Sequence, residues 1–287
     1  MDLYSETLQI LKKYNVFANK SLGQNFLISE EIVNNIIEKA EVSKEDLVIE
    51  IGPGLGTLTK ELLRNAGKVI CIELDKRMIS ILEDRFSNEN LCIINDDVLK
   101  VNLNELIQRE KVGNISRVKV VANLPYYITT PIIMKLLEEK LDIYSITVMV
   151  QKEVAQRITA TPESGNSGAI TYAIRYYTNP QIVIDVPSSS FVPEPEVQSS
   201  VIKLDILKAP SVNVKDEKLL FKVIKLAFMQ KRKTLLNSLR NANLLSNKKD
   251  IENMLIELNI DLKVRPEKLT LEKFAKISDY VYNIEEC

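Results

Sequence analysis

The sequence predicts an α/β domain with a largely parallel sheet, followed by a small all-helical domain. Short apolar runs alternate with helix-patterned segments, a glycine-rich loop follows the first of these runs, and the apolar spacing becomes purely helical beyond residue 216. With 287 residues, 45% of them hydrophobic, the chain is long and apolar enough for two packed domains.

The expected strands are short apolar runs of the length found in buried strands. Because they alternate with helical patterns, each crossover between parallel strands can be a helix. The strands are expected at residues 47–51, 68–72, 91–94, 118–121, 143–150, 182–186 and 200–206. Helices are expected at 3–14, directly after the N-capping Ser29, and at 57–65, 75–86, 130–140 and 152–160.

The second domain is expected to begin near Lys208-Ala-Pro-Ser211, where the last strand pattern ends. Beyond Asp216, apolar residues such as Leu219, Val223 and Ala227 recur at helical spacing. We therefore expect domains at residues 1–207 and 208–287.

Composition excludes several kinds of chemistry. Histidine is absent, which removes Ser-His-Asp and Cys-His catalysis and most transition-metal sites, and we expect no metal. Cys71, Cys92 and Cys287 have no close partner in sequence and fit neither a disulfide framework nor a zinc site. The longest interior apolar run, Tyr144–Val150, is far shorter than the roughly 20 residues of a membrane helix. A cytoplasmic location without membrane contact is expected.

A glycine loop, Glu50-Ile-Gly-Pro-Gly-Leu-Gly-Thr57, joins the first strand to a helix, where such folds bind nucleotide-like ligands. The dinucleotide fingerprint requires glycine at its sixth position, but counting from Gly52 that position is Thr57. A pyrophosphate is therefore disfavoured. S-adenosylmethionine carries no phosphate, and the turn at Gly52 and Gly54 leaves room for its amino-acid portion.

Two acidic residues follow the next two strands. Glu73 ends the second strand, and a carboxylate there can accept hydrogen bonds from both ribose hydroxyls of an adenosine. Asp97 follows the third strand and can accept from the adenine amino group of the cofactor. Their order at successive strand ends favours an adenosine-containing cofactor.

The segment Asn123-Leu-Pro-Tyr126 follows the fourth strand and predicts the chemistry. An adenine amino nitrogen gains positive charge as it attacks a sulfonium methyl group, so acceptors aimed at it lower the barrier. The side-chain oxygen of Asn123 is one acceptor, and the carbonyl of Leu124, held extended by the following proline, is a second. Tyr126 can stack on a base that has left its helix or loop.

With these residues in place, the chain resembles the ribosomal RNA adenine N6-dimethyltransferase family nearly end to end. Beside the glycine loop, the similar motifs are Lys20-Ser-Leu-Gly-Gln-Asn-Phe-Leu27, Val150-Gln-Lys-Glu-Val-Ala-Gln-Arg157 and Phe191-Val-Pro-Glu-Pro-Glu-Val-Gln-Ser199. The chain departs from the family pattern at Ser29, Glu196 and Gln198.

The resemblance implies a Rossmann-like S-adenosylmethionine-dependent methyltransferase domain. Its cofactor pocket would include Asn25 and Leu27, together with Gly52, Glu73, Asp97 and Asn123. It also implies that Phe191 sandwiches the target base opposite Tyr126. The product would be two adjacent N6,N6-dimethyladenosines near the 3′ end of small-subunit rRNA, made on an assembling ribosomal subunit. We expect the enzyme to be a monomer, although the sequence leaves the oligomeric state open.

A basic stretch supports RNA as the partner although the net charge is only −1. Met229-Gln-Lys-Arg-Lys-Thr-Leu-Leu-Asn-Ser-Leu-Arg240 resembles the basic helix start of the small-subunit enzymes. Cationic side chains there would contact RNA phosphates. The expected RNA-binding residues are Lys231, Arg232 and Lys233.

Three alternatives stand beside this reading. The sister family of large-subunit rRNA methyltransferases that confer macrolide resistance shares the Asn-x-Pro-Tyr segment, but the form of the glycine loop and the long helical C-terminal domain point away from it. A non-catalytic ribosome-assembly factor is disfavoured by the intact Asn123, Tyr126 and Glu73. A nicotinamide oxidoreductase is disfavoured by Thr57.

Overall fold

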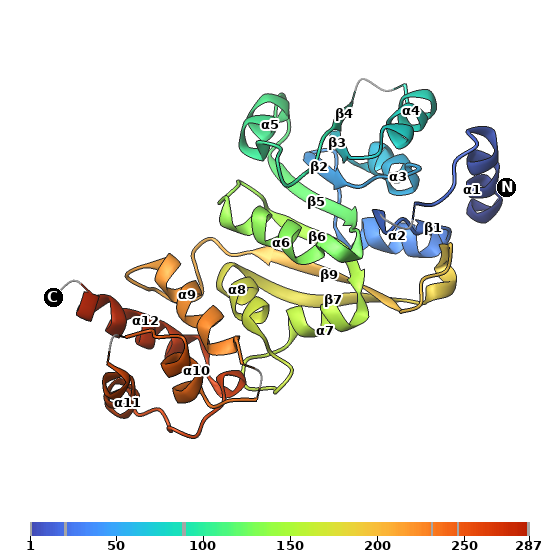
Figure 1. Ribbon diagram of the computed structural model, residues 1–287. Coiled ribbons are helices and arrows are strands. Elements are labelled where there is room, and N and C mark those ends of the chain that lie inside the picture. The colour runs from blue at the N-terminus through green and yellow to red at the C-terminus, as the bar shows by residue number, and fades with distance from the viewer. Residues whose placement is uncertain (1, 20–21, 88–89, 231, 246, 286–287) are drawn as a thin grey trace. The chain divides into compact units, whose positions relative to one another are not determined.

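The computed structural model describes residues 2–19, 22–87, 90–230, 232–245 and 247–285. The chain divides into two compact units (Figure 1). Residues 1–155 and 180–206 make up the first unit, and residues 156–179 and 207–287 make up the second.

A seven-stranded sheet forms the centre of the first unit. Strand β2 pairs in parallel with β3 on one side and β5 on the other, and β9 pairs antiparallel with β6. The chain therefore reverses its direction of winding between β2 and β5, which is where open α/β sheets hold ligands. In spatial order the strands are β4 (Leu91–Asn95), β3 (Lys68–Glu73), β2 (Asp46–Ile51), β5 (Arg117–Asn123), β6 (Ser145–Gln151), β9 (Ser199–Ile206) and β7 (Thr178–Val186).

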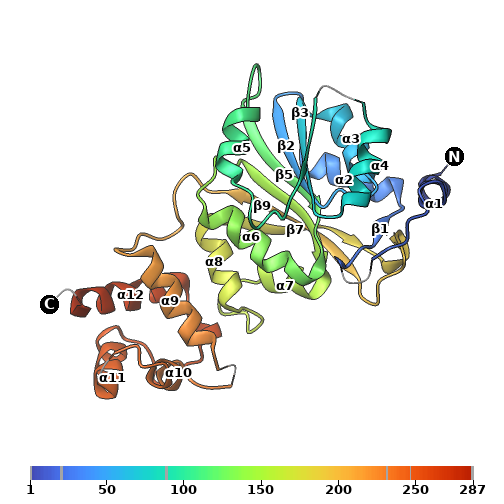
Figure 2. The same ribbon diagram turned by 45° about the horizontal axis from the view of Figure 1, so that its top comes forward.

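Helices cover both faces of this sheet (Figure 2). On one face lie α2 (Glu30–Lys39), α3 (Thr57–Asn65) and α4 (Lys76–Arg85), and on the other α5 (Leu103–Glu110) and α6 (Thr129–Glu138). Ile36 and Leu62 pack with Val48, Cys71 and Met149 of the strands in one buried apolar cluster. The first unit also includes α1 (Leu3–Lys13), the 3-10 turn Ser188–Ser190, and a small sheet of β1 (Phe26–Leu27) with β8 (Phe191–Val192).

The strands confirm the seven expected from sequence, and α3 has the expected bounds. Ser29 caps α2 by accepting a hydrogen bond from the backbone N–H of Ile32, also as expected. Helices α5 and α8 (Ala169–Tyr177) were not expected. Helix α7 (Lys152–Thr159) continues from the first unit into the second.

The second unit is helical, as expected for the C-terminal part, but it also includes α8. The Tyr172 ring is fully buried and meets the Phe274 ring edge-on at a centroid distance of 5.0 Å. Its hydroxyl donates to the carbonyl of Leu269 at 2.7 Å. Residues 156–179 therefore fold with the C-terminal helices, whereas the sequence placed one boundary at residue 207. The C-terminal helices of the second unit are α9 (Glu217–Phe228), α10 (Leu235–Asn241), α11 (Lys248–Glu257) and α12 (Leu271–Glu285), with a 3-10 turn at Pro266–Lys268.

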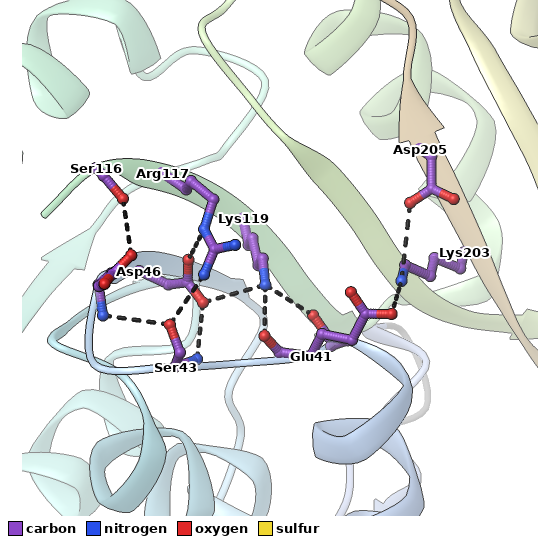
Figure 3. Close-up of polar contacts among 10 residues, drawn as sticks. Glu41, Ser43, Asp46, Ser116, Arg117, Lys119, Lys203 and Asp205 are labelled. Atoms are coloured by element: carbon purple, nitrogen blue, oxygen red, sulfur yellow. Dashed lines mark hydrogen bonds and ion pairs between the residues drawn. The ribbon is translucent and has the colours of Figure 1, made fainter.

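A buried charge network lies at the edge of the sheet where β2 and β5 begin (Figure 3). The Asp46 side chain is completely buried and that of Lys119 is 1% exposed, with 3.1 Å between the Lys119 Nζ and the Asp46 Oδ2. The same Nζ donates to the carbonyls of Ala40 and Glu41 at the end of α2. Arg117 donates to the other oxygen of Asp46 at 2.8 Å. The network therefore ties the C-terminal end of α2 to the sheet.

Within the described chain, no helix has both the length and the apolar character needed to cross a membrane.

Candidate active site

One cavity opens at the carboxyl ends of the parallel strands. Its walls come from the segment before and in β1, the loop after β2, the end of β3, the turn after β4 and the turn after β5. Nine residues singled out from the sequence line it: Asn25, Leu27, Gly52, Gly54, Glu73, Asp97, Asn123, Leu124 and Tyr126.

The glycine loop lines the cavity between the end of β2 and the start of α3. Gly52 and Gly54 have φ values of +66° and +56°, a left-handed conformation that glycine adopts at little cost. A Cβ atom on Gly52 would lie 3.8 Å from the ring of Pro125. The loop therefore passes close to the turn after β5, so a ligand on the loop would lie beside that turn.

Glu73 is held rigidly at the end of β3. Its Oε2 accepts from the backbone N–H of Gly54 at 3.1 Å and its Oε1 from the N–H of Asp75 at 2.8 Å. Burial raises the pKa of this carboxyl, and the backbone hydrogen bonds oppose the shift. Each carboxylate oxygen keeps a further lone pair, so Glu73 can still accept from ribose hydroxyls.

Glu50 lies behind the loop and was noted in the sequence only as the start of the glycine motif. It lines the cavity, is 1% exposed, and its Oε2 accepts from the Thr59 hydroxyl at 2.6 Å. Burial raises the pKa of Glu50 to about 7. This carboxyl therefore titrates near neutral pH in the folded protein.

The Glu50→Gln variant is expected to gain stability relative to the wild type as the pH rises. The folded-state pKa of about 7 lies above the ordinary value of 4.5, so the folded protein binds more protons in this window. In the wild type, the contribution of the Glu50 carboxyl to the free energy of unfolding therefore falls by at most about 3 kcal/mol as the pH rises from 4.5 to 7. Glutamine does not titrate, so the variant does not show this fall. Urea unfolding at pH 4.5, 6 and 7.5 measures the difference.

A matched control is Glu31→Gln, which changes an exposed carboxyl on α2. Its effect on the free energy of unfolding is expected to be nearly the same at all three pH values. A Glu50→Gln effect that is equally flat would show that folding does not shift the pKa of this carboxyl.

Asp97 lies in the turn after β4, half-buried and lining the cavity. Its Oδ1 accepts from the backbone N–H of Leu99 at 3.0 Å, which fixes the carboxylate direction. Its neighbour Asp96 also lines the cavity, and its Oδ1 accepts from the Asp97 N–H at 2.7 Å. The cavity thus has two carboxylates at the position where the sequence indicated one.

Asn123 ends β5, and its amide has a defined orientation. The Nδ2 group donates to the carbonyl of Asn25 at 3.3 Å, which leaves the Oδ1 atom as the acceptor. Within the described chain no donor reaches this oxygen. The predicted acceptor is therefore available to a ligand.

Leu124 presents a second available acceptor. Its side chain is buried and its N–H donates to the Met149 carbonyl at 3.2 Å, which anchors the residue to β6. The carbonyl oxygen of Pro125 accepts from the backbone N–H of Ile128 and from the hydroxyl of Thr129. No donor in the described chain reaches the carbonyl oxygen of Leu124. Two adjacent residues therefore leave two acceptor oxygens for one amino group.

Tyr126 begins the 3-10 turn Tyr126–Ile128 and is tied to a distant strand. Its hydroxyl lies 2.6 Å from the hydroxyl of Ser199, the fully buried first residue of β9. Burial raises the pKa of Tyr126, so the phenol is neutral at physiological pH. The ring direction is therefore fixed by a partner 73 positions away in the chain.

Phe191 is not among the cavity-lining residues. It is 2% exposed, lies opposite Leu27 in the β1–β8 pair, and packs in the same apolar cluster as Val33. Its expected stacking on a base would require the ring to leave this cluster. That role stays a prediction.

The expected RNA-binding residues lie in the second unit. Arg232 and Lys233 are exposed between α9 and α10, and no ion pair involving them is found in the described chain. Lys231 lies outside the described residues, as do Lys20, Ser21 and Cys287.

Several cavity residues were not identified from the sequence, including Gln24, Asp96 and Tyr127. Gln24 donates from Nε2 to the Asp75 Oδ2 at 3.0 Å, joining the segment before β1 to the start of α4. Because Gln24 follows the motif glycine and Tyr127 follows Tyr126, proximity to a motif was the available signal.

The fold and the cavity together define a class of protein. A sheet that reverses its winding beside a glycine turn, a buried acidic side chain ending β3 and an asparagine ending β5 is the arrangement of an S-adenosylmethionine-dependent methyltransferase. The residues fit this cofactor: the glycine turn leaves space, Glu73 can bind a ribose, and the two acceptor oxygens lie beside the loop.

Comparison with known proteins identifies the family. Residues 15–283 match the model of the family described as ribosomal RNA adenine dimethylase. The chain is 50% identical over 279 residues to ribosomal RNA small subunit methyltransferase A of Clostridium botulinum, covering 97% of this chain and 99% of the relative. It is 46% identical over 275 residues to the protein of that name from Alkaliphilus oremlandii, covering 96% and 95%. The chain belongs to the ribosomal RNA adenine dimethylase family.

Solved structures agree in fold. A dimethyladenosine transferase from Plasmodium falciparum superposes with a TM-score of 0.72 at 28% identity, covering 88% of this chain and 95% of that one. The 23S rRNA methyltransferase ErmE superposes with a TM-score of 0.65 at 23% identity, covering 90% and 100%, a likeness that bears on the fold alone. Family membership confirms the expected class of enzyme and excludes the nicotinamide oxidoreductase.

Proposed function

We propose that this protein transfers methyl groups from S-adenosylmethionine to the N6 atoms of two adjacent adenosines near the 3′ end of 16S rRNA, giving N6,N6-dimethyladenosines during small-subunit biogenesis. The observation that carries the proposal is the pair of available acceptors, Asn123 Oδ1 and Leu124 O, beside the glycine loop. Relatives that are 50% and 46% identical to this chain are named small subunit methyltransferases, which favours the small subunit over the large one as the substrate.

The residues supply positioning and electrostatic stabilisation. S-adenosylmethionine supplies an electrophilic methyl group when bound. In the first transfer Asn123 and Leu124 accept from the two N–H groups of the adenine amine, and in the second transfer one of them accepts from the single N–H that remains. These hydrogen bonds direct the lone pair of the nitrogen and stabilise the positive charge that develops on it. No general base is needed before the methyl group moves, and the extra proton on the methylated nitrogen is then lost to solvent.

The cofactor is proposed to lie along the remaining walls. Glu73 accepts from the ribose hydroxyls, Asp97 accepts from the cofactor's adenine amino group, and Gly52 and Gly54 give space to the amino-acid portion. Asn25 and Leu27 close the pocket from the segment before α2. No group of three or more His, Cys, Asp or Glu side chains that could hold a metal ion is found in the described chain.

The test is to incubate the purified chain with radiolabelled S-adenosylmethionine and small subunits that lack the modification, and then to map the label. We expect label on two adjacent adenosines near the 3′ end of 16S rRNA. Large subunits serve as the control substrate. Label found only on large subunits would contradict the proposal. Label on one nucleotide alone, or on nucleotides that are not adjacent, would contradict it as well.

We further propose that the enzyme is a cytoplasmic monomer that docks rRNA through its helical second unit. Residues 208–287 carry sixteen Lys and Arg residues against eleven Asp and Glu residues, although the whole chain has a net charge of −1. This excess of positive charge supports electrostatic contact with RNA phosphates.

Replacing Arg232 and Lys233 together by alanine is expected to weaken binding to small subunits roughly tenfold at moderate salt, because two phosphate contacts are lost. The slope of log affinity against log salt should become shallower by about 1.5. Filter binding at four salt concentrations measures both quantities.

The matched control removes two exposed lysines of α11, Lys248 and Lys249, by the same double substitution. It changes the net charge equally and is expected to have a much smaller effect. An unchanged salt slope in the Arg232/Lys233 variant would exclude these residues as phosphate contacts.

A further inference from the structure

Two consecutive tyrosines differ sharply in their surroundings. Tyr126 is half-buried and its hydroxyl is bound to that of Ser199. Tyr127 also lines the cavity, but the residue is 55% exposed and its hydroxyl has no partner in the described chain. A large aromatic ring on the rim of a cavity, exposed and without a polar partner, is available to a ligand.

The turn explains how the two rings separate. Residues Tyr126–Ile128 form a 3-10 turn, in which successive side chains point about a third of a turn apart. Tyr126 can therefore be held against β9 while Tyr127 lies at the rim.

The Tyr127 ring is supported on one side by backbone. A Cβ atom on Gly23 would lie 3.5 Å from the Cδ1 atom of Tyr127, and Gly23 itself has a φ of +62°. The ring therefore lies against the segment before β1 while the residue stays exposed. Such support restricts the ring without covering it, which reduces the entropy lost when a flat ligand stacks on it.

We propose that Tyr127 is the stacking platform for the unpaired base next to the target adenine. Extruding one adenine into the cavity removes the stacking partner of its neighbour, and an aromatic ring at the cavity rim can replace that partner. This inference rests on the proposed function, in which the neighbour is itself an adenosine to be methylated. Tyr127 then sets how the second adenosine is presented.

The first experiment compares Tyr127→Ala, Tyr127→Phe and the wild type. We expect Tyr127→Ala to raise KM for unmethylated small subunits about tenfold, the loss of one stacked base, with a much smaller change in kcat. Phenylalanine keeps the ring and should restore KM to within about twofold. The dissociation constant of S-adenosylmethionine, measured by calorimetry on the free enzyme, should not change.

The control is Tyr144→Ala. Tyr144 is 50% exposed and lies next to the first residue of β6, at the edge of the sheet opposite the cavity. Its loss is expected to leave KM unchanged. Thermal unfolding of all variants identifies any loss of KM that comes from misfolding.

The second experiment changes the RNA. In reconstituted small subunits, the adenosine beside the mapped target is replaced by uridine, which stacks more weakly. Wild-type KM for the remaining adenosine should rise, whereas that of Tyr127→Ala should rise much less, because the platform is already missing.

Three outcomes would overturn the inference. The KM of Tyr127→Ala could equal that of the wild type, or its affinity for S-adenosylmethionine could fall by as much as its KM for small subunits rises. The uridine substitution could also raise the KM of the wild type and of Tyr127→Ala by the same factor. Each can occur while the wild type methylates two adjacent adenosines. If the wild type methylates neither, the proposed function fails instead.

Discussion

The Asn123→Ala variant is expected to lose at least about a hundredfold in kcat, because it removes one of two acceptors aimed at the reacting amine. Alanine also removes the donor to the Asn25 carbonyl. Binding of S-adenosylmethionine and of small subunits should change little. Single-turnover methylation, calorimetry and filter binding measure the three quantities separately.

Asn104→Ala is a suitable control because it removes an exposed amide on α5. It is expected to have wild-type kcat. If Asn123→Ala retained wild-type turnover, Asn123 would have no part in methyl transfer, and the proposed reaction geometry would be wrong.

Much of the site could be predicted because its residues follow successive strands. Gly52, Glu73 and Asn123 come at or just after the ends of β2, β3 and β5, and parallel strands bring such ends to one edge of the sheet. The contact between Tyr126 and Ser199 could not be predicted, because 73 residues separate them and β9 runs antiparallel to β6.

Burial was harder to predict than position. Glu50 in a strand next to glycines gave no sign that its carboxyl would be enclosed with Thr59 and Cys71. For Phe191 the sequence did carry a signal, but the signal did not predict burial. Its motif indicates a role in base contact, but its pairing opposite Leu27 and its apolar neighbours determine that the ring is buried in this structure.

The missed helix α8 shows why the second unit begins earlier than expected. Its sequence, Ala-Ile-Thr-Tyr-Ala-Ile-Arg-Tyr-Tyr, is rich in β-branched and aromatic residues, which favour strands in isolation. Packing of Tyr172 against Phe228 and Phe274 overrides that preference. Tertiary contacts with residues some 100 positions away are not visible in a local pattern.

The Lys119→Met variant is expected to lose about 3–5 kcal/mol of unfolding free energy, because it leaves a buried charge with less compensation. Asp46 would keep Arg117 and the backbone N–H of Ser43, but its Oδ2 would lose its cation. The carbonyls of Ala40 and Glu41 would lose the same donor. Urea unfolding measures the loss.

Two further variants separate the buried pair from an ordinary surface pair. Lys111→Met breaks a pair with Asp142, whose side chain is 83% exposed, and should cost no more than about 1 kcal/mol. Adding Asp46→Asn to Lys119→Met should recover part of the loss, because the uncompensated carboxylate is then removed. The network lies at the edge of the sheet opposite the cavity, so kcat below the unfolding transition should stay at the wild-type value in all three. A Lys119→Met loss as small as that of Lys111→Met would mean that packing around the aliphatic stem, rather than the ion pair and its hydrogen bonds, holds α2 to the sheet.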